Sequence, residues 1–204
     1  FHVSDCTAEE TFTGRYFYSD EQVIDASIDL LNQAFPADAD GPWLLLENLW
    51  HPGLTFTRAE MTRRLLEGLV YPKTGLMLDT GHLMHTCPSL TDPDQAVDYI
   101  HRQLDRHGDL CDAVLGVHLN LSLTGAYAAE VRANPPKLAA DYATRSGQMF
   151  AHIFRQDQHR PFLSPALPAL LQRIGPRWLT YEFITENRAQ HQAELAAQRQ
   201  TLAA

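Results

Sequence analysis

The sequence predicts an α/β fold built around a parallel sheet. Strand-like and helix-like segments alternate along the 204 residues, which is typical of successive strand–helix units. The strand-like segments are short apolar runs, as expected for strands that are buried on both faces. Each run also carries a carboxylate or an imidazole near its C-terminal end, where parallel α/β proteins build their active sites.

Five strands are expected, and the length agrees with a single domain. They are FHVS at the N-terminus, WLLLEN at 43–48, GLMLDT at 75–80, AVLGVHLN at 113–120 and WLTYEFI at 178–184. No GxGxxG fingerprint follows the first strand, which argues against a Rossmann domain. The general alternative for such a pattern is an open, doubly wound sheet.

Capping signals place the first two helices. Ser19 begins SDEQ, a capping box, and the helix that follows should end before Pro36. TRAE at 57–60 resembles a second capping box and predicts a helix to about Gly68.

The third helix has the strongest boundaries, because Asp92 is a capping residue, Pro93 suits the first turn and Gly108 follows the end. The region between 120 and 157 is harder to interpret, since it contains a polar stretch and an uncertain helix at 138–150. HIFRQD is either a short strand or a loop. A short helix at 164–174 and a closing helix from Asn187 complete the chain.

Composition narrows the class of function. Apolar residues make up 45% and charged residues 20% of the chain, as in an ordinary globular protein. The net charge is −9 and only two of the sixteen basic residues are lysines, so nucleic acid and anionic membranes are disfavoured partners. The apolar runs are too short to cross a bilayer, and three cysteines without CxxC spacing predict no disulfide, so we expect a cytoplasmic protein.

The polar residues at the strand ends are the candidate site. Singly, each has a structural explanation, such as a buried core histidine or an aspartate that caps a turn. Together they are harder to explain this way, because buried carboxylates without partners are costly. A divalent cation would make them compatible, and their types suit Zn²⁺ or Mn²⁺. The candidate ligands are His2, Glu47, Asp79, His82, His118 and Glu182.

Four of these motifs resemble a known superfamily. LLLEN, LMLDTGH, GVHLN and LTYEF are similar, in order and spacing, to the last four strands of the xylose isomerase-like TIM barrels. That superfamily includes sugar isomerases, epimerases and apurinic endonuclease IV. The resemblance implies a (β/α)8 TIM barrel whose first strands are missing from this chain. An incomplete barrel would expose apolar edges, so we expect a homo-oligomer or poor solubility.

The resemblance also implies roles for individual residues. The metal ligands of the superfamily fall on Glu47, Asp79, His118 and Glu182, and the two glutamates double as catalytic acid and base. His82 is similar to a residue that binds substrate in the isomerases and a second metal in the endonuclease.

Two features are similar to the endonuclease branch alone. His2 lies where that branch has a zinc ligand, and Asp157-x-His159 resembles its pair for a third zinc. The stretch from His118 to Asp157 is longer than in that branch. One to three ions are therefore expected.

Other residues are candidates for substrate contacts. Trp50 follows Glu47 on a loop, Asn120 follows His118, and Arg160 follows the Asp-x-His pair and could hold a phosphate or a carboxylate. The remaining histidines are interpreted as surface or loop residues; they include His85, His101, His107 and His191.

Three functions follow from this pattern. The first is a metal-dependent isomerase or epimerase of a small polyhydroxy or sugar-phosphate substrate, which the acidic charge favours. The second is a zinc-dependent phosphodiesterase like endonuclease IV, which the number of ligands favours. The third is a barrel that only binds a ligand. Asp157 and His159 separate the two enzymes: they should turn inward in the phosphodiesterase and overhang the site in the isomerase.

Overall fold

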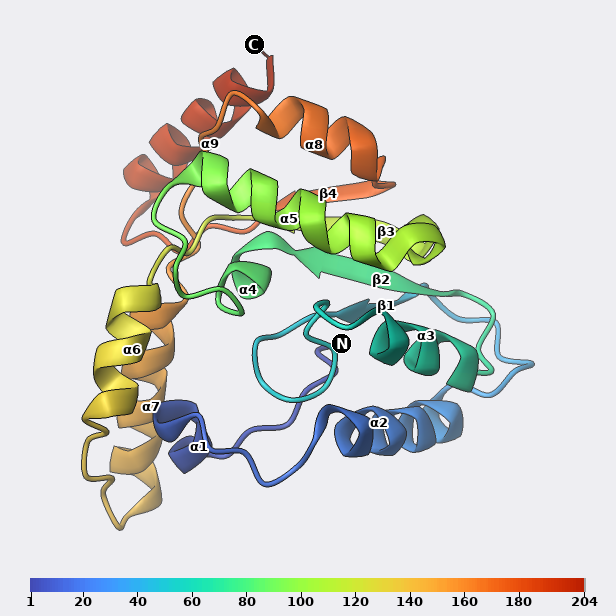
Figure 1. Cartoon of the computed structure of the whole chain (residues 1–204), viewed down its shortest axis with the longest axis horizontal. Helices are drawn as coiled ribbons and strands as arrows, with labels where there is room; N and C mark the ends of the chain where they lie inside the picture. The colour runs from blue at the N-terminus through green and yellow to red at the C-terminus, as the bar shows by residue number, and fades with distance from the viewer. Residues whose placement is uncertain (204) are drawn as a thin grey trace.

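The sheet of this computed structural model has four parallel strands, and the structure describes residues 1–203. The strands are β1 (Leu44–Glu47), β2 (Thr74–Asp79), β3 (Val114–Leu119) and β4 (Trp178–Tyr181), in the order β1-β2-β3-β4 (Figure 1). Four of the expected strands and the α/β class are therefore confirmed. Each strand is added beside its predecessor in the chain, so all four carboxyl ends lie along one edge.

The helices connect and extend these strands. Those in the described part of the chain are α1 (Ala8–Thr13), α2 (Asp20–Ala34), α3 (Ala59–Gly68), α4 (Thr80–Met84), α5 (Pro93–His107), α6 (Gly125–Ala133), α7 (Tyr142–Gln156), α8 (Leu167–Ile174) and α9 (Arg188–Ala203). A 3₁₀ helix, η1 (Gly108–Ala113), follows α5. No helix among residues 1–203 is both long enough and apolar enough to cross a membrane.

The expected N-terminal strand is less regular than the others. It meets β1 through a single parallel bridge between His2 and Glu47. The Glu47 amide donates to the carbonyl of Phe1 at 2.8 Å, and the Val3 amide donates to the carbonyl of Glu47 at 3.2 Å. The segment therefore runs beside β1 and brings His2 to the carboxyl end of that strand.

One face of the sheet carries the hydrophobic core. Leu46, Leu78 and Val117 are buried on this face with apolar residues of α2, α3, α5 and α8. Leu45 and Met77 alternate with core residues along β1 and β2, and both are only half-buried. A doubly wound sheet would bury both faces and reverse its strand order, so that alternative is wrong for the described residues.

A second group of helices lies beyond the carboxyl ends of the strands. Figure 1 shows α1, α6 and α7 at the end of the molecule toward which β2 points. The uncertain helix at 138–150 is α7, which begins at Tyr142 because Asp141 accepts a hydrogen bond from the Thr144 amide at 2.9 Å. Residues 152–156 of HIFRQD form the end of this helix and Asp157 follows it as the cap, so the interpretation of this segment as a short strand or a loop was wrong for all but its last residue.

Capping residues behave as predicted at two helices and differently at a third. Ser19 forms the predicted capping box of α2, and Asp92 caps α5 by accepting from the Gln95 amide. The predicted box at TRAE is wrong, because α3 is preceded by Arg58 without a side-chain cap. The hydroxyl of Thr57 is instead 2.7 Å from that of Thr55.

Candidate metal centre

The four principal candidate ligands come from four neighbouring strands. Glu47 and Asp79 are the last residues of β1 and β2, His118 pairs in register with Asp79, and Glu182 follows β4 directly. Each residue offers a ligand atom, and these atoms all lie within 4.8 Å of one another. Parallel pairing without reversal is what brings them together, because all the strands end at the same edge.

One nitrogen faces three carboxylates in this cluster. His118 Nδ1 lies 3.0 Å from Glu47 Oε1, 3.0 Å from Glu182 Oε2 and 3.9 Å from Asp79 Oδ2. Burial alone would lower the pKa of His118, but its hydrogen bonds with Glu182 and Glu47 outweigh this effect and raise it to about 10. A positive charge therefore belongs at this point, carried by a proton or by a cation.

Two polar atoms of the centre are incompletely satisfied. Glu182 Oε2 is buried, and its partners are His118 Nδ1 at 3.0 Å, which it shares with Glu47, and His159 Nδ1 at 3.9 Å. His159 Nδ1 is also buried and has this distant carboxylate oxygen as its partner. A carboxylate oxygen and an imidazole nitrogen in this arrangement are atoms that a divalent cation would satisfy, so these residues fit a metal.

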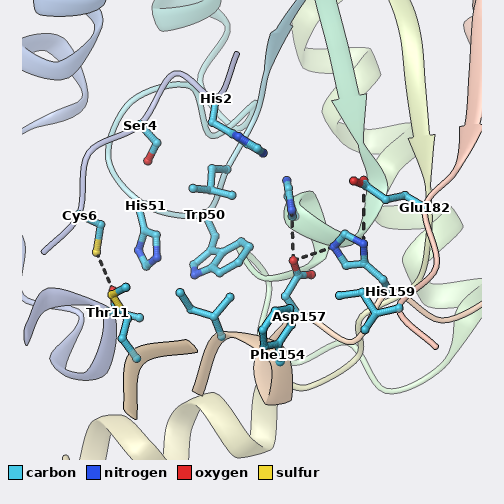
Figure 2. A pocket seen from close by; sticks show the side chains of 15 residues that line it. His2, Ser4, Cys6, Thr11, Trp50, His51, Phe154, Asp157, His159 and Glu182 are labelled. Carbon is cyan, nitrogen blue, oxygen red and sulfur yellow. Dashed lines mark hydrogen bonds and ion pairs between the residues drawn. The ribbon is translucent and has the colours of Figure 1, made fainter. Parts of the chain in front are cut away.

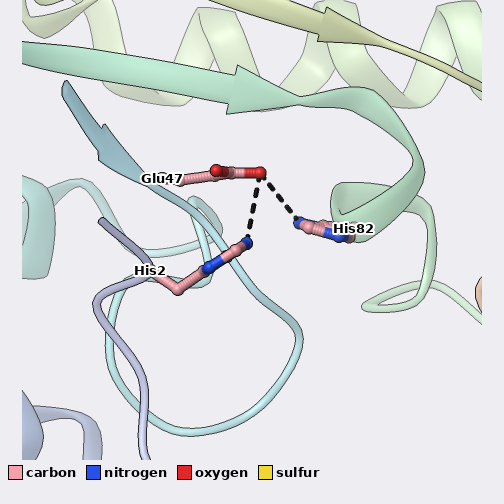
Figure 3. A group of neighbouring side chains, drawn as sticks. All are labelled: His2, Glu47 and His82. Carbon is pink, nitrogen blue, oxygen red and sulfur yellow. Dashed lines mark ion pairs between the residues drawn. The ribbon is translucent and has the colours of Figure 1, made fainter. Parts of the chain in front are cut away.

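Glu47 also belongs to a second group, which Figure 3 shows. His2 Nε2 lies 3.3 Å and His82 Nδ1 lies 3.6 Å from Glu47 Oε1. Burial would raise the pKa of Glu47, but the bonds with His118 and His2 hold it well below its usual range. Glu47 is therefore a carboxylate shared between two possible cation positions.

A third group forms around Asp157. His159 Nε2 lies 2.7 Å and His82 Nε2 lies 3.2 Å from Asp157 Oδ2 (Figure 2). His82 Nδ1 is held by the carbonyl oxygen of Asn48 at 2.9 Å, which leaves Nε2 for a ligand. His82 therefore suits the Asp157 group better than the Glu47 group. Asp157 and His159 are both buried and turn inward.

Asp79 has both of the functions that a strand-terminal aspartate can have. Its Oδ1 caps α4 by accepting a hydrogen bond from the His82 amide at 2.7 Å. Its Oδ2 accepts from Asn120 Nδ2 at 2.8 Å and faces the cluster. Asp79 is completely buried, and burial raises its pKa. The turn thus holds the carboxylate in place within the site.

Sequence reasoning missed the residues that position Asp157. His85 Nε2 at 3.2 Å and the Ser122 hydroxyl at 3.1 Å both contact Oδ1, so Oδ2 is left for the histidines. His85 was interpreted as a surface or loop residue; it does lie in the turn that follows α4, but it is not at the surface, because only 8% of it is exposed. The spacing of His82 and His85 on α4 is the signal that could have found it. His107 is also buried, stacked on Phe56, contrary to expectation.

The structure places the three proposed substrate contacts differently. Trp50 is buried beside the centre, with its ring 5.3 Å from that of His82. Asn120 holds Asp79, so it positions a candidate ligand. Arg160 turns away from the centre and pairs with Glu194 at 2.8 Å. Of these three, only Trp50 lines the cavity over the centre.

No protein-family model matches this chain, and it has no significant match among curated proteins. What the centre can do is therefore inferred from its own geometry. Eight side chains meet at one edge of the sheet: His2, Glu47, Asp79, His82, His118, Asp157, His159 and Glu182. This set is rich enough in carboxylates and imidazoles to hold more than one divalent cation.

Proposed function

We propose that this chain is a metal-dependent hydrolase of phosphate esters with a centre of two or three zinc-type ions. The observation that carries the proposal is the inward orientation of Asp157 and His159, which adds a second ligand group beside the first. An isomerase that uses only the ion of the first ligand group would leave these two residues free to contact substrate. The TIM barrel of the xylose isomerase-like superfamily is part of the same proposal, supported by the sequential order of the parallel strands.

The candidate ligands divide into groups with different roles. Glu47, Asp79, His118 and Glu182 would hold one ion. His82 and His159 would hold another, together with Asp157, which contacts both of them, and beside Asp79. His2 with Glu47 offers a third, less complete position. Bound ions of this kind activate water and stabilise the negative charge that develops on a phosphoryl group.

The chain itself supplies a candidate for proton transfer. The Glu182 side chain is 40% exposed, whereas those of Glu47 and Asp79 are 8% and 0% exposed. Glu182 is therefore the carboxylate that an attacking water reaches first, and it would accept the proton. Glu47 is tied to His118 and His2 and its pKa is held low, which favours a role in holding an ion over a role as the proton acceptor.

The isomerase remains a second candidate for one specific reason. Glu47 and Glu182 lie at equal distances of 3.0 Å from His118 Nδ1, as expected for an acid and a base on either side of one ion. In that reaction they would move a proton between adjacent carbons of a small hydroxy carbonyl compound. A homo-oligomer also stays a prediction, supported by the exposed apolar side chains of Trp43 and Leu179.

Metal stoichiometry tests the proposal. Zinc-loaded protein should contain two or three equivalents and hydrolyse bis(4-nitrophenyl) phosphate. His159→Ala should lose one equivalent and most of that turnover, because the Asp157 group loses a ligand. His191→Ala is the matched control, since His191 is exposed and outside the centre. The isomerase would be established instead by two results together. Wild type and His159→Ala would each contain one equivalent of metal, and only His159→Ala would have lost the interconversion of an aldose and a ketose.

A further inference from the structure

The cavity over the metal centre extends well beyond the candidate ligands. Its volume is about 480 Å³, and Figure 2 shows its two ends on either side of Trp50. One end is formed by the charged residues of the centre, including Asp157, His159 and Glu182. The other end is formed by Ser4, Cys6, Thr11 and His51 together with apolar side chains. This second end has no role in metal binding.

Helix α7 supplies the apolar wall of the cavity. Met149 and Ile153 lie four residues apart, and Asp157 follows four residues later, so all three lie on one face of the helix. Phe154 extends this wall next to Ile153. The helix face that delivers Asp157 to the centre therefore also lines the space in which the rest of a substrate would lie.

The polar atoms at the far end are already bonded within the protein. The Ser4 hydroxyl donates to the carbonyl of Pro52 at 3.0 Å, and Cys6 Sγ is 3.1 Å from the Thr11 hydroxyl. His51 Nδ1 is 3.1 Å from the Tyr16 hydroxyl. These groups therefore have few hydrogen bonds left for a sugar or for another polyhydroxy compound.

The far end also carries no charge at neutral pH. Burial raises the pKa of the Cys6 thiol to about 11, and burial lowers the pKa of His51 to about 4, so both groups are neutral. No lysine or arginine is among the residues that line the cavity. A nucleic acid would leave its remaining phosphates in this space without a cation.

We propose that the far end of this cavity is a binding site for an apolar, aromatic-sized group of the substrate. The proposed function places the phosphate of that substrate at the metal centre. The inference rests on the proposed function only for the position of this phosphate, and not for the apolar group. The substrate class is then a phosphate ester of a small apolar alcohol or phenol. In the hydrolysis, the oxygen of a water molecule would form a bond to phosphorus as the bond between phosphorus and the ester oxygen breaks. Glu182 would accept one proton of that water, and the apolar alcohol would leave with a proton on its oxygen.

The wall is held in place before any ligand binds. His152, next to Ile153 on α7, is stacked on Phe12 of α1 with ring centroids 4.5 Å apart. Its two ring nitrogens contact the Tyr127 hydroxyl at 2.8 Å and the carbonyl of Thr11 at 3.3 Å. Helix α7 is thereby fastened to both α1 and α6, so binding requires little ordering of this wall.

Two binding measurements test the site separately from the metal chemistry. In zinc-loaded protein, phenylphosphonate should bind roughly tenfold more tightly than methylphosphonate, because the ring is removed from water at the apolar end. In metal-free protein, saturation-transfer NMR should detect binding of benzyl alcohol but not of glycerol. Equal affinities of the two phosphonates, or no preference for benzyl alcohol over glycerol, would overturn the inference.

Two substitutions in α7 test whether its cavity-lining face causes the preference for phenylphosphonate. Phe154→Ser should reduce the ratio of phenylphosphonate affinity to methylphosphonate affinity by roughly threefold or more, because contact area with the ring is lost. The same variant should weaken the benzyl alcohol signal. Phe150→Ser is the matched control, since Phe150 is similarly exposed on the same helix but does not line the cavity. Equal effects of both variants would also contradict the site. Retained benzyl alcohol binding without any phosphonate binding would refute the proposed function alone.

Discussion

Asp157 depends on two neighbours for the direction of its carboxylate. His85 and Ser122 hold Oδ1, so that Oδ2 faces His82 and His159. Partners of this kind orient metal ligands, and removing them weakens metal binding about 10- to 100-fold. His85→Phe would remove the hydrogen bond and keep an aromatic ring against Trp50. We expect it to weaken binding of one zinc equivalent by that factor.

Isothermal titration with zinc would measure this loss. The control is His191→Phe, which changes an exposed histidine that is not among the candidate ligands. Unchanged zinc binding in His85→Phe would show that Ser122 alone is sufficient to orient Asp157.

The raised pKa values of two histidines predict how pH affects the metal-free protein. Hydrogen bonds with Glu182 and Glu47 raise the pKa of His118 to about 10, against the opposing effect of burial. The nearby charge of Asp79 and the bond to Asp157 raise that of His82 to about 9, also against burial. Protonation therefore stabilises the fold fully below about pH 6.5, and this stability is lost as pH rises through 9 and 10.

Thermal unfolding from pH 7 to about pH 10 tests this prediction, with Tm expected to fall in the metal-free protein. Bound zinc should make Tm depend less on pH, because the ion replaces the protons on these imidazoles. His118→Gln should show a smaller fall than wild type. A Tm that rises over this range would show that the two histidines are not protonated in the folded protein.

At the scale of single residues, sequence reasoning identified the ligand candidates but not the residues that orient them. Asp79 and His118 follow apolar runs directly, so the strand pattern alone placed them at one edge. His85 and Ser122 act on Asp157 across 72 and 35 residues of sequence. Such contacts depend on how α4 and the loop after β3 pack against α7, which no local pattern encodes.

Helix α4 begins so close to β3 that one of its positions requires glycine. A Cβ at Gly81 would overlap Asn120 Oδ1, and Asn120 is the residue that donates to Asp79. Gly81→Ala should destabilise the protein by about 1–3 kcal/mol, as overpacking of a buried contact does. It should also weaken zinc binding, because Asn120 must move away from Asp79.

Gly147→Ala in α7 is the matched control. A Cβ there meets no atom within 4 Å, so the change should stabilise the helix by about 0.5–1 kcal/mol. Urea unfolding of both variants measures the difference. Equal stability of Gly81→Ala and wild type would mean that α4 can shift without disturbing the centre.

At the scale of elements, capping boxes and apolar runs predicted α2, α5 and the four strands well. The region of α6 and α7 was predicted poorly. Helix α6 consists largely of small and polar residues and has only Ala128 buried, so it lacks an apolar face that sequence could reveal. HIFRQD has the apolar start of a strand, but Asp141 fixes a helix that continues through it.

The distribution of charge over the whole molecule predicts weak binding to nucleic acid. The net charge is −9, and several arginines are already paired with carboxylates, among them Arg58, Arg64 and Arg173. We expect no mobility shift of duplex or single-stranded DNA at physiological salt. Tight, salt-sensitive retention would contradict both this prediction and the apolar substrate inferred for the cavity.

The parallel order of the sheet followed from the sequence, because strand and helix segments alternate regularly. The sequence did not predict that the hydrophobic core covers only one face of the sheet, because the strand sequences are apolar at successive positions and therefore on both faces. Leu45 and Met77 are as apolar as Leu46 and Leu78, yet they lie on the half-buried face. Only the three-dimensional arrangement of the helices distinguishes the two sets.

The two walls of the cavity come from parts of the chain that could change separately over evolution. The strand ends carry most of the candidate ligands, whereas α7, the second helix of the α6–α7 hairpin, lines the space for the rest of a substrate. A lineage could therefore alter the α6–α7 hairpin to accept a new compound and keep its chemistry. Changes near Asp157 would be limited, because this residue directly follows α7 and is itself part of the centre. Related proteins should diverge most at the tip of the hairpin and least at its C-terminal end.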